Sequence, residues 1–201
     1  LDDVEWQGGQ AIATGDMHSN LPALTLKEIA AKSGRTGGPI AGHNEIVADG
    51  AGMGFASHIC DVEVDPETGR SQVVRYTVVQ DAGKAINPDY VEGQFQGAAA
   101  QGIGWALNEE YIYGDDGRLQ NAGFLDYRIP VCSDMPFIDT KILEVPNPNH
   151  PYGIRGVGET SIVPPLGAVG NAIADATGVR MTHAPMSPPR VLSALDARDA
   201  G

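Results

Sequence analysis

Hydrophobic and polar residues alternate most regularly between positions 56 and 80 of the chain. Every second position from Ala56 to Val64 is apolar or weakly polar and has mostly polar neighbours, which is the period of a half-buried strand. The sequence Asp-Pro-Glu-Thr-Gly at 65–69 predicts a tight turn, because proline fixes one dihedral angle and glycine adopts positive ones. Residues 73–80, rich in valine, then form the returning strand. The pattern therefore predicts a β-hairpin.

Helices are predicted where a capping residue precedes a run with helical spacing. Asn87 and Pro88 begin the longest, which extends to about Glu109, because asparagine caps a helix and proline is tolerated in its first turn. Shorter helices are expected at 24–32, at 164–177 and from Ser187 to about Leu195. The other expected segments are an edge strand or irregular lead-in at 1–14, an exposed loop at 33–54, a second hairpin at 111–119 and onward with its turn at 114–117, and a strand at 138–145.

Glycines interrupt the long helix predicted after Asn87. Each interior glycine destabilises a helix by roughly 1 kcal/mol relative to alanine, so we expect the close approach of a backbone or a ligand to compensate. Gln94, Gly97 and Gln101 are three and then four residues apart and therefore share one helical face. Two amides around a gap suit hydrogen bonding to a flat polar ligand, and surface glutamines beside a packing notch are the alternative. The glycines are Gly93, Gly97, Gly102 and Gly104.

The composition favours a loop-rich mixed fold. Glycine and proline contribute 26 and 14 residues, which is high for a helical bundle, and a hydrophobic fraction of 42% argues against disorder. Together with the hairpins, this predicts an α+β fold in which a mixed β-sheet with hairpins packs against helices. We expect residues 1–201 to form a single unit, with a loop-rich lead-in at 1–54 and a motif-bearing part at 55–201.

Charge and cysteine content exclude several classes of function. The chain has 26 acidic and 13 basic residues, a net charge of −13, and no basic cluster, so we expect no nucleic-acid partner. Cys60 and Cys132 are too few for a zinc or iron–sulfur site and are typical of free thiols in a reducing, cytoplasmic compartment. No apolar run reaches the ~18 residues of a membrane span. The five scattered histidines show no metal-ligand spacing.

The segment at 152–160 has the composition of a loop that contacts a ligand. Gly156 and Gly158 flank Val157, and glycine lets a backbone pass close to another group because it lacks Cβ. Glu159 follows directly and brings an ionisable side chain to the same place. Its alternative role is that of a carboxylate at a helix N-terminus, accepting hydrogen bonds from free amides.

Five motifs occur along the chain in a fixed order. They are Val-Glu-Val-Asp-Pro-Glu-Thr-Gly at 62–69, Asp-Ala-Gly-Lys-Ala-Ile-Asn-Pro at 81–88, the glycine-broken helix at 91–104, Leu-Asp-Tyr-Arg-Ile-Pro at 125–130, and Gly-Val-Gly-Glu at 156–159. In this order they resemble the C-terminal portion of the molybdenum-binding large subunit of the xanthine dehydrogenase/aldehyde oxidase/carbon monoxide dehydrogenase family. The resemblance extends from about Phe55 onward.

The resemblance implies a molybdopterin cofactor, often in its cytosine dinucleotide form, whose molybdenum is held through the pterin and not directly by this chain. Gln101 matches the glutamine of the family's Gln-Gly-hydrophobic-Gly element against the pterin, Gln94 and Gly97 share its face, and the backbone at 156–158 passes the metal. Glu159 matches a buried glutamate beside the metal. The resemblance implies that it is the general base of a hydroxylation that inserts water-derived oxygen at an electrophilic carbon of an N-heteroaromatic or aldehyde substrate.

The resemblance also implies partner chains, because the family's large subunit is much longer on its N-terminal side. We expect a larger molybdenum-binding chain that completes the site, an iron–sulfur subunit with a [2Fe-2S] cluster, and FAD on a flavin subunit or another electron acceptor. The chain is then a naturally split subunit, as in nicotinate dehydrogenase, or a fragment. A non-catalytic assembly partner and a stand-alone ligand-binding module are the alternatives.

Overall fold

The computed structural model describes residues 3–14, 20–47, 50 and 52–200. The chain divides into two compact units, Leu1–Val47 and Ala48–Gly201. This differs from the single unit with a loop-rich lead-in through residue 54 that the sequence led us to expect. The physical reason is that strands within the first 47 residues satisfy their backbone hydrogen bonds in a sheet of their own.

The first unit is a small antiparallel sheet followed by one helix. Its elements are β1 (Val4–Gln7), β2 (Gln10–Ala13), β3 (Leu24–Thr25) and α1 (Leu26–Ser33). α1 begins at a capping box, because Thr25 Oγ1 accepts from the Glu28 N–H while the Glu28 carboxylate accepts from the Thr25 N–H. The predicted helix is confirmed, and the lead-in is a hairpin. Residues 34–47 form turns and extended chain, as predicted; residues 1, 2, 48, 49 and 51 lie outside the described residues.

The second unit is built on a mixed sheet of three strands in the order β4–β5–β6. They are β4 (Ala56–Val64), β5 (Ser71–Asp81) and β6 (Ile138–Leu143). β4 and β5 form the predicted hairpin, paired from Ala56 opposite Gln80 to Val64 opposite Ser71 with one register shift between Asp61 and Val62. β6 pairs with β5 in parallel. A parallel neighbour requires a long crossover connection, and the segment that makes this crossover contains the longest helix.

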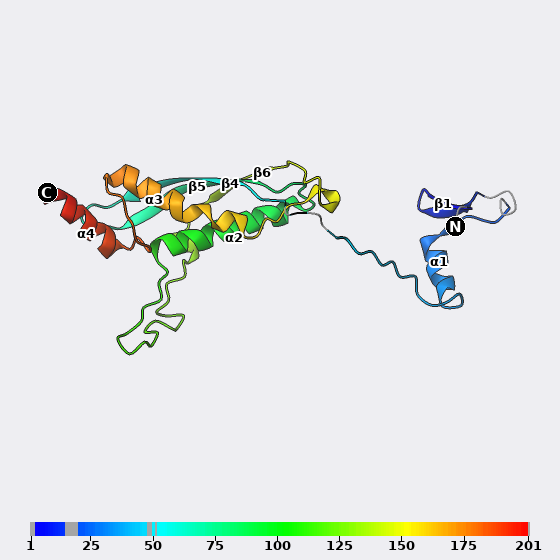
Figure 1. Cartoon of the computed structure of the whole chain (residues 1–201), viewed down its shortest axis with the longest axis horizontal. Coiled ribbons are helices and arrows are strands. Elements are labelled where there is room, and N and C mark those ends of the chain that lie inside the picture. Colours follow the sequence, from blue (N-terminus) through cyan, green and yellow to red (C-terminus); the bar gives the residue numbers. More distant parts are fainter. Residues whose placement is uncertain (1–2, 15–19, 48–49, 51, 201) are drawn as a thin grey trace. The chain divides into compact units, whose positions relative to one another are not determined.

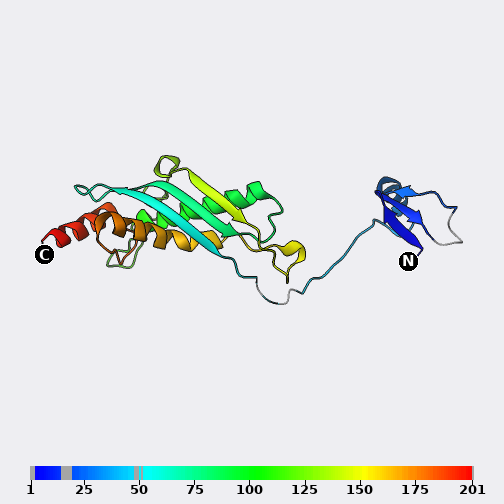
Figure 2. The ribbon, with the colours of Figure 1, turned by 90° about the horizontal axis from the view of Figure 1, so that it is seen from above.

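Two helices cover one face of this sheet and make its core. The unit's helices are α2 (Pro88–Leu107), α3 (Pro164–Thr177) and α4 (Pro188–Asp199). α2 contacts β5, β6 and α3, and α3 contacts β4, so the two helices lie beside each other against the strands (Figures 1 and 2). Fully buried core residues are Tyr76, Val78, Phe95, Ile103, Val169 and Ile173. This helix-on-sheet layering confirms the α+β prediction.

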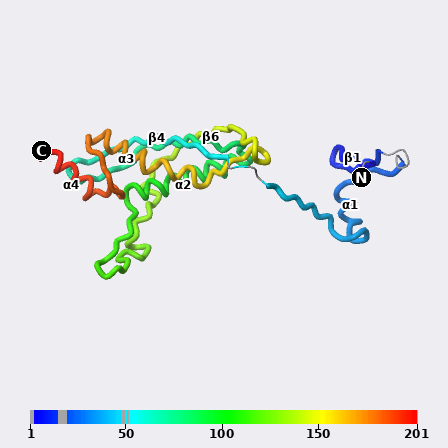
Figure 3. The backbone as a smooth tube through the Cα atoms, viewed as in Figure 1, coloured from blue at the N-terminus to red at the C-terminus, as the bar shows by residue number. Residues whose placement is uncertain are grey.

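Between α2 and β6 the chain extends away from the sheet as an arm, residues 109–131 (Figures 1 and 3). The second hairpin predicted here is present in a short form. The Gly117 N–H donates to the Gly114 carbonyl in the predicted turn, and two more backbone hydrogen bonds, Gly114 N–H to Arg118 and Gln120 N–H to Ile112, flank a single bridge between Tyr113 and Leu119. The Asn121 side chain explains the difference. Its carbonyl oxygen accepts from the Ile112 N–H at 3.0 Å and its amide donates to the Glu110 carbonyl at 2.6 Å, in place of a strand's backbone.

Candidate functional site

The glutamine–glycine face of α2 and the segment ending at Glu159 meet at one depression in the surface of the second unit. Its volume is about 360 Å³. The residues lining it are Gly93, Gln94, Gly97, Ala98, Gln101, Gly158, Glu159 and Ile162. Two segments that are far apart in the sequence therefore form opposite walls of one site, which we call the α2 wall and the loop wall.

The α2 wall follows from the helical period. Phe95 and Ile103 are completely buried on the face towards the sheet, which leaves Gln94, Gly97 and Gln101 exposed on the other face. The predicted sharing of one face by these three residues is present in the structure.

The four interior glycines of α2 fall into two pairs. A Cβ atom at Gly102 would lie 2.6 Å from the ring of Pro165, and a Cβ atom at Gly104 would lie 2.6 Å from the ring of Pro130. A Cβ atom at Gly93 or Gly97 would meet nothing within 4 Å. The packing notch that was the alternative for the glutamine–glycine face thus lies at the C-terminal pair of glycines. The other pair, Gly93 and Gly97, leaves the helix surface beside the glutamines bare.

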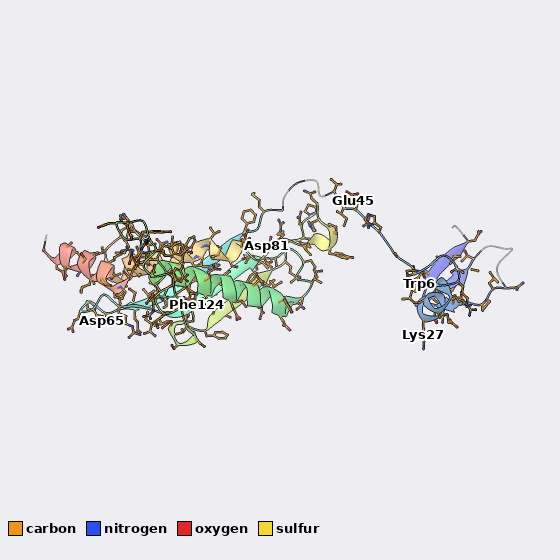
Figure 4. The ribbon with its side chains drawn as sticks, turned by 90° about the horizontal axis from the view of Figure 1, so that it is seen from below. Trp6, Lys27, Glu45, Asp65, Asp81 and Phe124 are labelled. Carbon is orange, nitrogen blue, oxygen red and sulfur yellow. The ribbon has the colours of Figure 1, made fainter. Side chains whose placement is uncertain are left out.

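One buried ion pair anchors the loop wall, which consists of residues 151–159. Arg155 Nε lies 2.9 Å from a carboxylate oxygen of Asp81, and the two side chains are only 12% and 9% exposed. The same guanidinium donates to the carbonyl oxygens of Val145 and Met53 at 3.1 and 2.8 Å. Figure 4 labels Asp81 where β5 ends, so the ion pair ties the loop to that end of the sheet.

Backbone contacts provide the loop wall with a second anchor. Gly83 and Ile154 form an isolated β-bridge, and the Arg155 N–H donates to the Ala82 carbonyl at 3.0 Å. Gly83 has a φ of 64°, and a Cβ atom there would lie 2.9 Å from the Arg155 nitrogen. Glycine is therefore required at this position both by its dihedral angle and by the close approach of the loop.

Glu159 directly precedes the 3₁₀ turn η3 (Thr160–Ile162) and its side chain is exposed at the depression. The side chain makes no capping hydrogen bond to the turn, so the alternative of a helix-terminal carboxylate is not realised. The resemblance implied a buried glutamate, whereas here the carboxylate faces an open depression. At its edge the two walls are in contact, since Gln94 Oε1 lies 3.7 Å from where a Cβ atom of Gly158 would stand. A carboxylate and two amides are thus available to a ligand from two sides.

Not every predicted site residue reaches the depression. Gly156 is exposed outside it, and Val157 packs against the core of the unit. The structure brings together Gln94, Gly97, Gln101, Gly158 and Glu159, and sequence reasoning missed Gly93, Ala98 and Ile162. It also missed Gln80 and Ser161, which lie buried behind Glu159; the available signal was a glutamine within the valine-rich strand at 73–80.

Other candidate chemistry is limited. Among the described residues, no group of three or more histidine, cysteine, aspartate or glutamate side chains is arranged to hold a metal ion. Both cysteines are free, and burial raises the pKa of the Cys60 thiol to about 12. Of the helices that the structure describes, none has the length and apolar character needed to cross a membrane.

Comparison with known proteins identifies the family. The molybdopterin cofactor-binding domain family matches residues 1–136. The chain belongs to this family. It is 38% identical over 138 residues to the 6-hydroxypseudooxynicotine dehydrogenase complex subunit gamma of Paenarthrobacter nicotinovorans, covering 67% of this chain and 17% of that protein. It is 32% identical over 174 residues to the xanthine dehydrogenase molybdenum-binding subunit of Escherichia coli O157:H7, covering 85% and 23%.

A solved structure gives the same result for the fold. The quinoline 2-oxidoreductase of Pseudomonas putida 86 matches with a TM-score of 0.75 and 28% identity, covering 97% of this chain and 26% of that chain. The chain thus spans about a quarter or less of the length of these relatives. The resemblance drawn from five motifs to the molybdenum-binding subunits of the xanthine dehydrogenase family is confirmed.

The depression fits a flat, polar cofactor of this kind. No atom lies within 4 Å of where a Cβ atom of Gly93 or Gly97 would stand, so a planar group can approach the helix backbone there. Gln94 and Gln101 each carry an amide that can donate and accept hydrogen bonds at the edge of that surface.

Proposed function

We propose that this chain is the part of a molybdenum hydroxylase that holds the pterin and supplies the catalytic base. The observation that carries the proposal is one depression that is lined by Gln94, Gln101 and Glu159 and by two glycines of α2 whose surface is bare. The names of the relatives support the assignment, since they are molybdenum-binding subunits and oxidoreductases.

In this proposal the α2 wall holds the cofactor. Gln101 and Gln94 hydrogen-bond the polar edge of the pterin, and Gly97 lets the ring system lie against the helix. The backbone at Gly158, with Gly156 and Val157 before it, forms the opposite boundary. When bound, the molybdenum cofactor supplies a two-electron acceptor for the substrate. The cytosine dinucleotide form is proposed for this cofactor.

Glu159 takes a proton as general base in this scheme. Its carboxylate is exposed at the depression and is not engaged in capping its own turn, so it is available to a water-derived nucleophile beside the cofactor. General-base catalysis of this kind contributes roughly 10²- to 10⁴-fold to a rate. The oxygen that is inserted comes from water, and the carbon attacked is electrophilic.

The substrate class is an N-heteroaromatic compound or an aldehyde. Quinoline 2-oxidoreductase and the aldehyde oxidoreductase of Megalodesulfovibrio gigas, which is 38% identical over 145 residues, represent these two classes among the relatives. The partners we propose are a larger molybdenum-binding chain that completes the site, a [2Fe-2S] subunit and a flavin subunit, in the cytoplasm. Relatives named as subunits of complexes support partner chains in general.

The decisive experiment replaces Glu159 by glutamine in the assembled, molybdenum-loaded protein. We expect kcat to fall by roughly 10²- to 10⁴-fold with the molybdenum content unchanged, because the base is lost and the cofactor contacts remain. Glu92→Gln is the matched control, since Glu92 is exposed on α2 outside the depression. Full turnover in Glu159→Gln would instead favour a non-catalytic assembly partner.

A further inference from the structure

A buried hydrogen bond lies directly beneath the turn that follows Glu159. Ser161 Oγ donates to Gln80 Oε1, and both side chains are completely buried. Ser161 belongs to η3, whereas Gln80 lies near the end of β5, one residue before Asp81. The contact therefore connects the turn behind the loop wall to the central strand of the sheet.

Gln80 is an unusual side chain for its position. It lies on the core face of β5 in the same alternation as Tyr76 and Val78, both of which are fully buried. Its Nε2 atom is buried and has no hydrogen-bond partner in the structure. Burying an unsatisfied amide is unfavourable, and an unbranched apolar side chain of similar size would fill the same volume. The hydrogen bond to Ser161 is thus the interaction that an apolar residue at this position could not make.

The position of Glu159 depends on this turn. The Ile162 N–H donates to the Glu159 carbonyl at 3.3 Å, so the backbone of Glu159 is part of the turn that Ser161 holds. The Glu159 side chain makes no capping hydrogen bond of its own. The backbone therefore sets the point from which this side chain extends, and the backbone in turn is set by what anchors η3 to the sheet.

We propose that Gln80 and Ser161 are positioning residues that hold Glu159 towards the depression. Neither residue lines the depression, so neither touches a ligand there. Their role is to fix the orientation of the carboxylate through the turn, at the expense of an unsatisfied amide in the core. This inference rests on the proposed function, in which Glu159 is the general base.

The first test is Gln80→Met in the assembled, cofactor-loaded protein. Methionine keeps the packing volume and removes both the hydrogen bond and the buried unpaired amide. We expect kcat to fall by about ten- to a hundredfold, since a displacement near 1 Å is enough for such a loss, with KM and molybdenum content unchanged. The melting temperature should not fall, and the amide of Ile162 should exchange hydrogen faster. A purely structural role would lower the melting temperature and leave kcat and this exchange rate unchanged.

A double-mutant cycle with Ser161→Ala gives a second measurement. If the pair acts as one unit, Ser161→Ala and Gln80→Met/Ser161→Ala reduce kcat by the same factor as Gln80→Met alone. Thr177→Val is the matched control, because it removes another buried hydroxyl group, which donates to the Ile173 carbonyl at the other end of α3. It should lower stability without changing kcat. Multiplicative losses in the double variant would overturn the proposal.

The two levels of the hypothesis fail in different ways. Full activity in Glu159→Gln would refute the proposed function and the positioning role together. A strong loss in Glu159→Gln with normal kcat and normal Ile162 exchange in Gln80→Met would refute the positioning role alone.

Discussion

The two walls of the depression are held in place by opposite kinds of interaction. The α2 wall is one face of a helix whose other face, with Phe95 and Ile103, is completely buried in the apolar core. The loop wall packs Val157 against this core but is held mainly by the Arg155–Asp81 ion pair and by backbone contacts to Gly83. Apolar packing tolerates substitution if volume is conserved, whereas a buried ion pair does not tolerate the loss of one partner.

This difference has a consequence for the site. The α2 wall is the fixed side of the site, because many core contacts hold it. The loop wall is the adjustable side, because its position depends on a few polar contacts. The glutamine side chains and the bare glycine positions of α2 that are proposed to hold the cofactor are on the fixed side. The carboxylate proposed to move a proton is on the other, where a single lost contact is expected to change its position.

Arg155→Met tests the loop wall and should have the largest effect. It leaves the Asp81 carboxylate buried without its cation, which typically destabilises a protein by about 3–5 kcal/mol. Arg75→Met is the control, because Arg75 and its partner Asp61 are 72% and 42% exposed and such pairs contribute at most about 1 kcal/mol. Chemical denaturation of both variants measures the difference. Equal losses would show that the loop is not held by this ion pair.

Gly102→Ala tests the packing side of α2. The added methyl group would stand 2.6 Å from the ring of Pro165, so α3 has to shift. Overpacking of this kind costs about 1–3 kcal/mol, of which the better helix propensity of alanine offsets about 1 kcal/mol. A lowered melting temperature is the expected result; an unchanged one would mean that the contact between α2 and α3 adapts freely.

Gly97→Ala is the matched substitution on the open side and should have the opposite sign for stability. Its methyl group meets nothing within 4 Å, so the helix gains about 1 kcal/mol from the alanine. If the cofactor lies against this position, molybdenum per protein should decrease in the same variant. Metal analysis beside thermal unfolding separates the two effects, and normal molybdenum loading would remove Gly97 from the proposed binding surface.

The smallest expected effect is a pH dependence that originates in the sheet beneath both walls. His58 hydrogen-bonds the Tyr76 hydroxyl group at 2.9 Å, and burial lowers its pKa from 6.5 to about 4. The unfolded chain therefore binds the proton more readily, so stability is full above pH 6.5 and is lost as the pH falls towards 4. Discounted for partial exposure, the loss is on the order of 1 kcal/mol. His58→Gln should reduce the slope of the unfolding free energy against pH between pH 4 and 7. An unchanged slope would assign the pH dependence to other groups.

The α2 wall was predictable from the sequence, and the anchors of the loop wall were not. Periodicity placed Gln94, Gly97 and Gln101 on one face, because in a helix the spacing of residues alone determines which of them share a face. Arg155 and Asp81 carry no such local signal, since their pairing arises only when a loop crosses the end of β5. The family resemblance brought Glu159 into the candidate site, but spacing alone could not show that Ser161 reaches Gln80 beneath it.

The same distinction holds for the fold. The β4–β5 hairpin was predicted because alternation and turn chemistry are both local. The second hairpin is shorter than predicted because one side chain, Asn121, takes the hydrogen bonds that would have continued its pairing. The parallel pairing of β5 with β6 was not predicted, since strand direction depends on a crossover that no short pattern encodes.

That parallel pairing divides the crossover into a constant and a variable part. α2 must lie on the sheet for β6 to return beside β5, so its register is fixed by the strands at both ends. The arm is held at its two ends, by the ion pair of Glu110 with Arg190 and by Pro130 against Gly104, and lengthening the loop between these points raises its closure entropy only slowly. In evolutionary terms, the turn of this arm at 114–117 is where the chain can acquire or lose residues to suit a new neighbour while the glutamine face stays where it is.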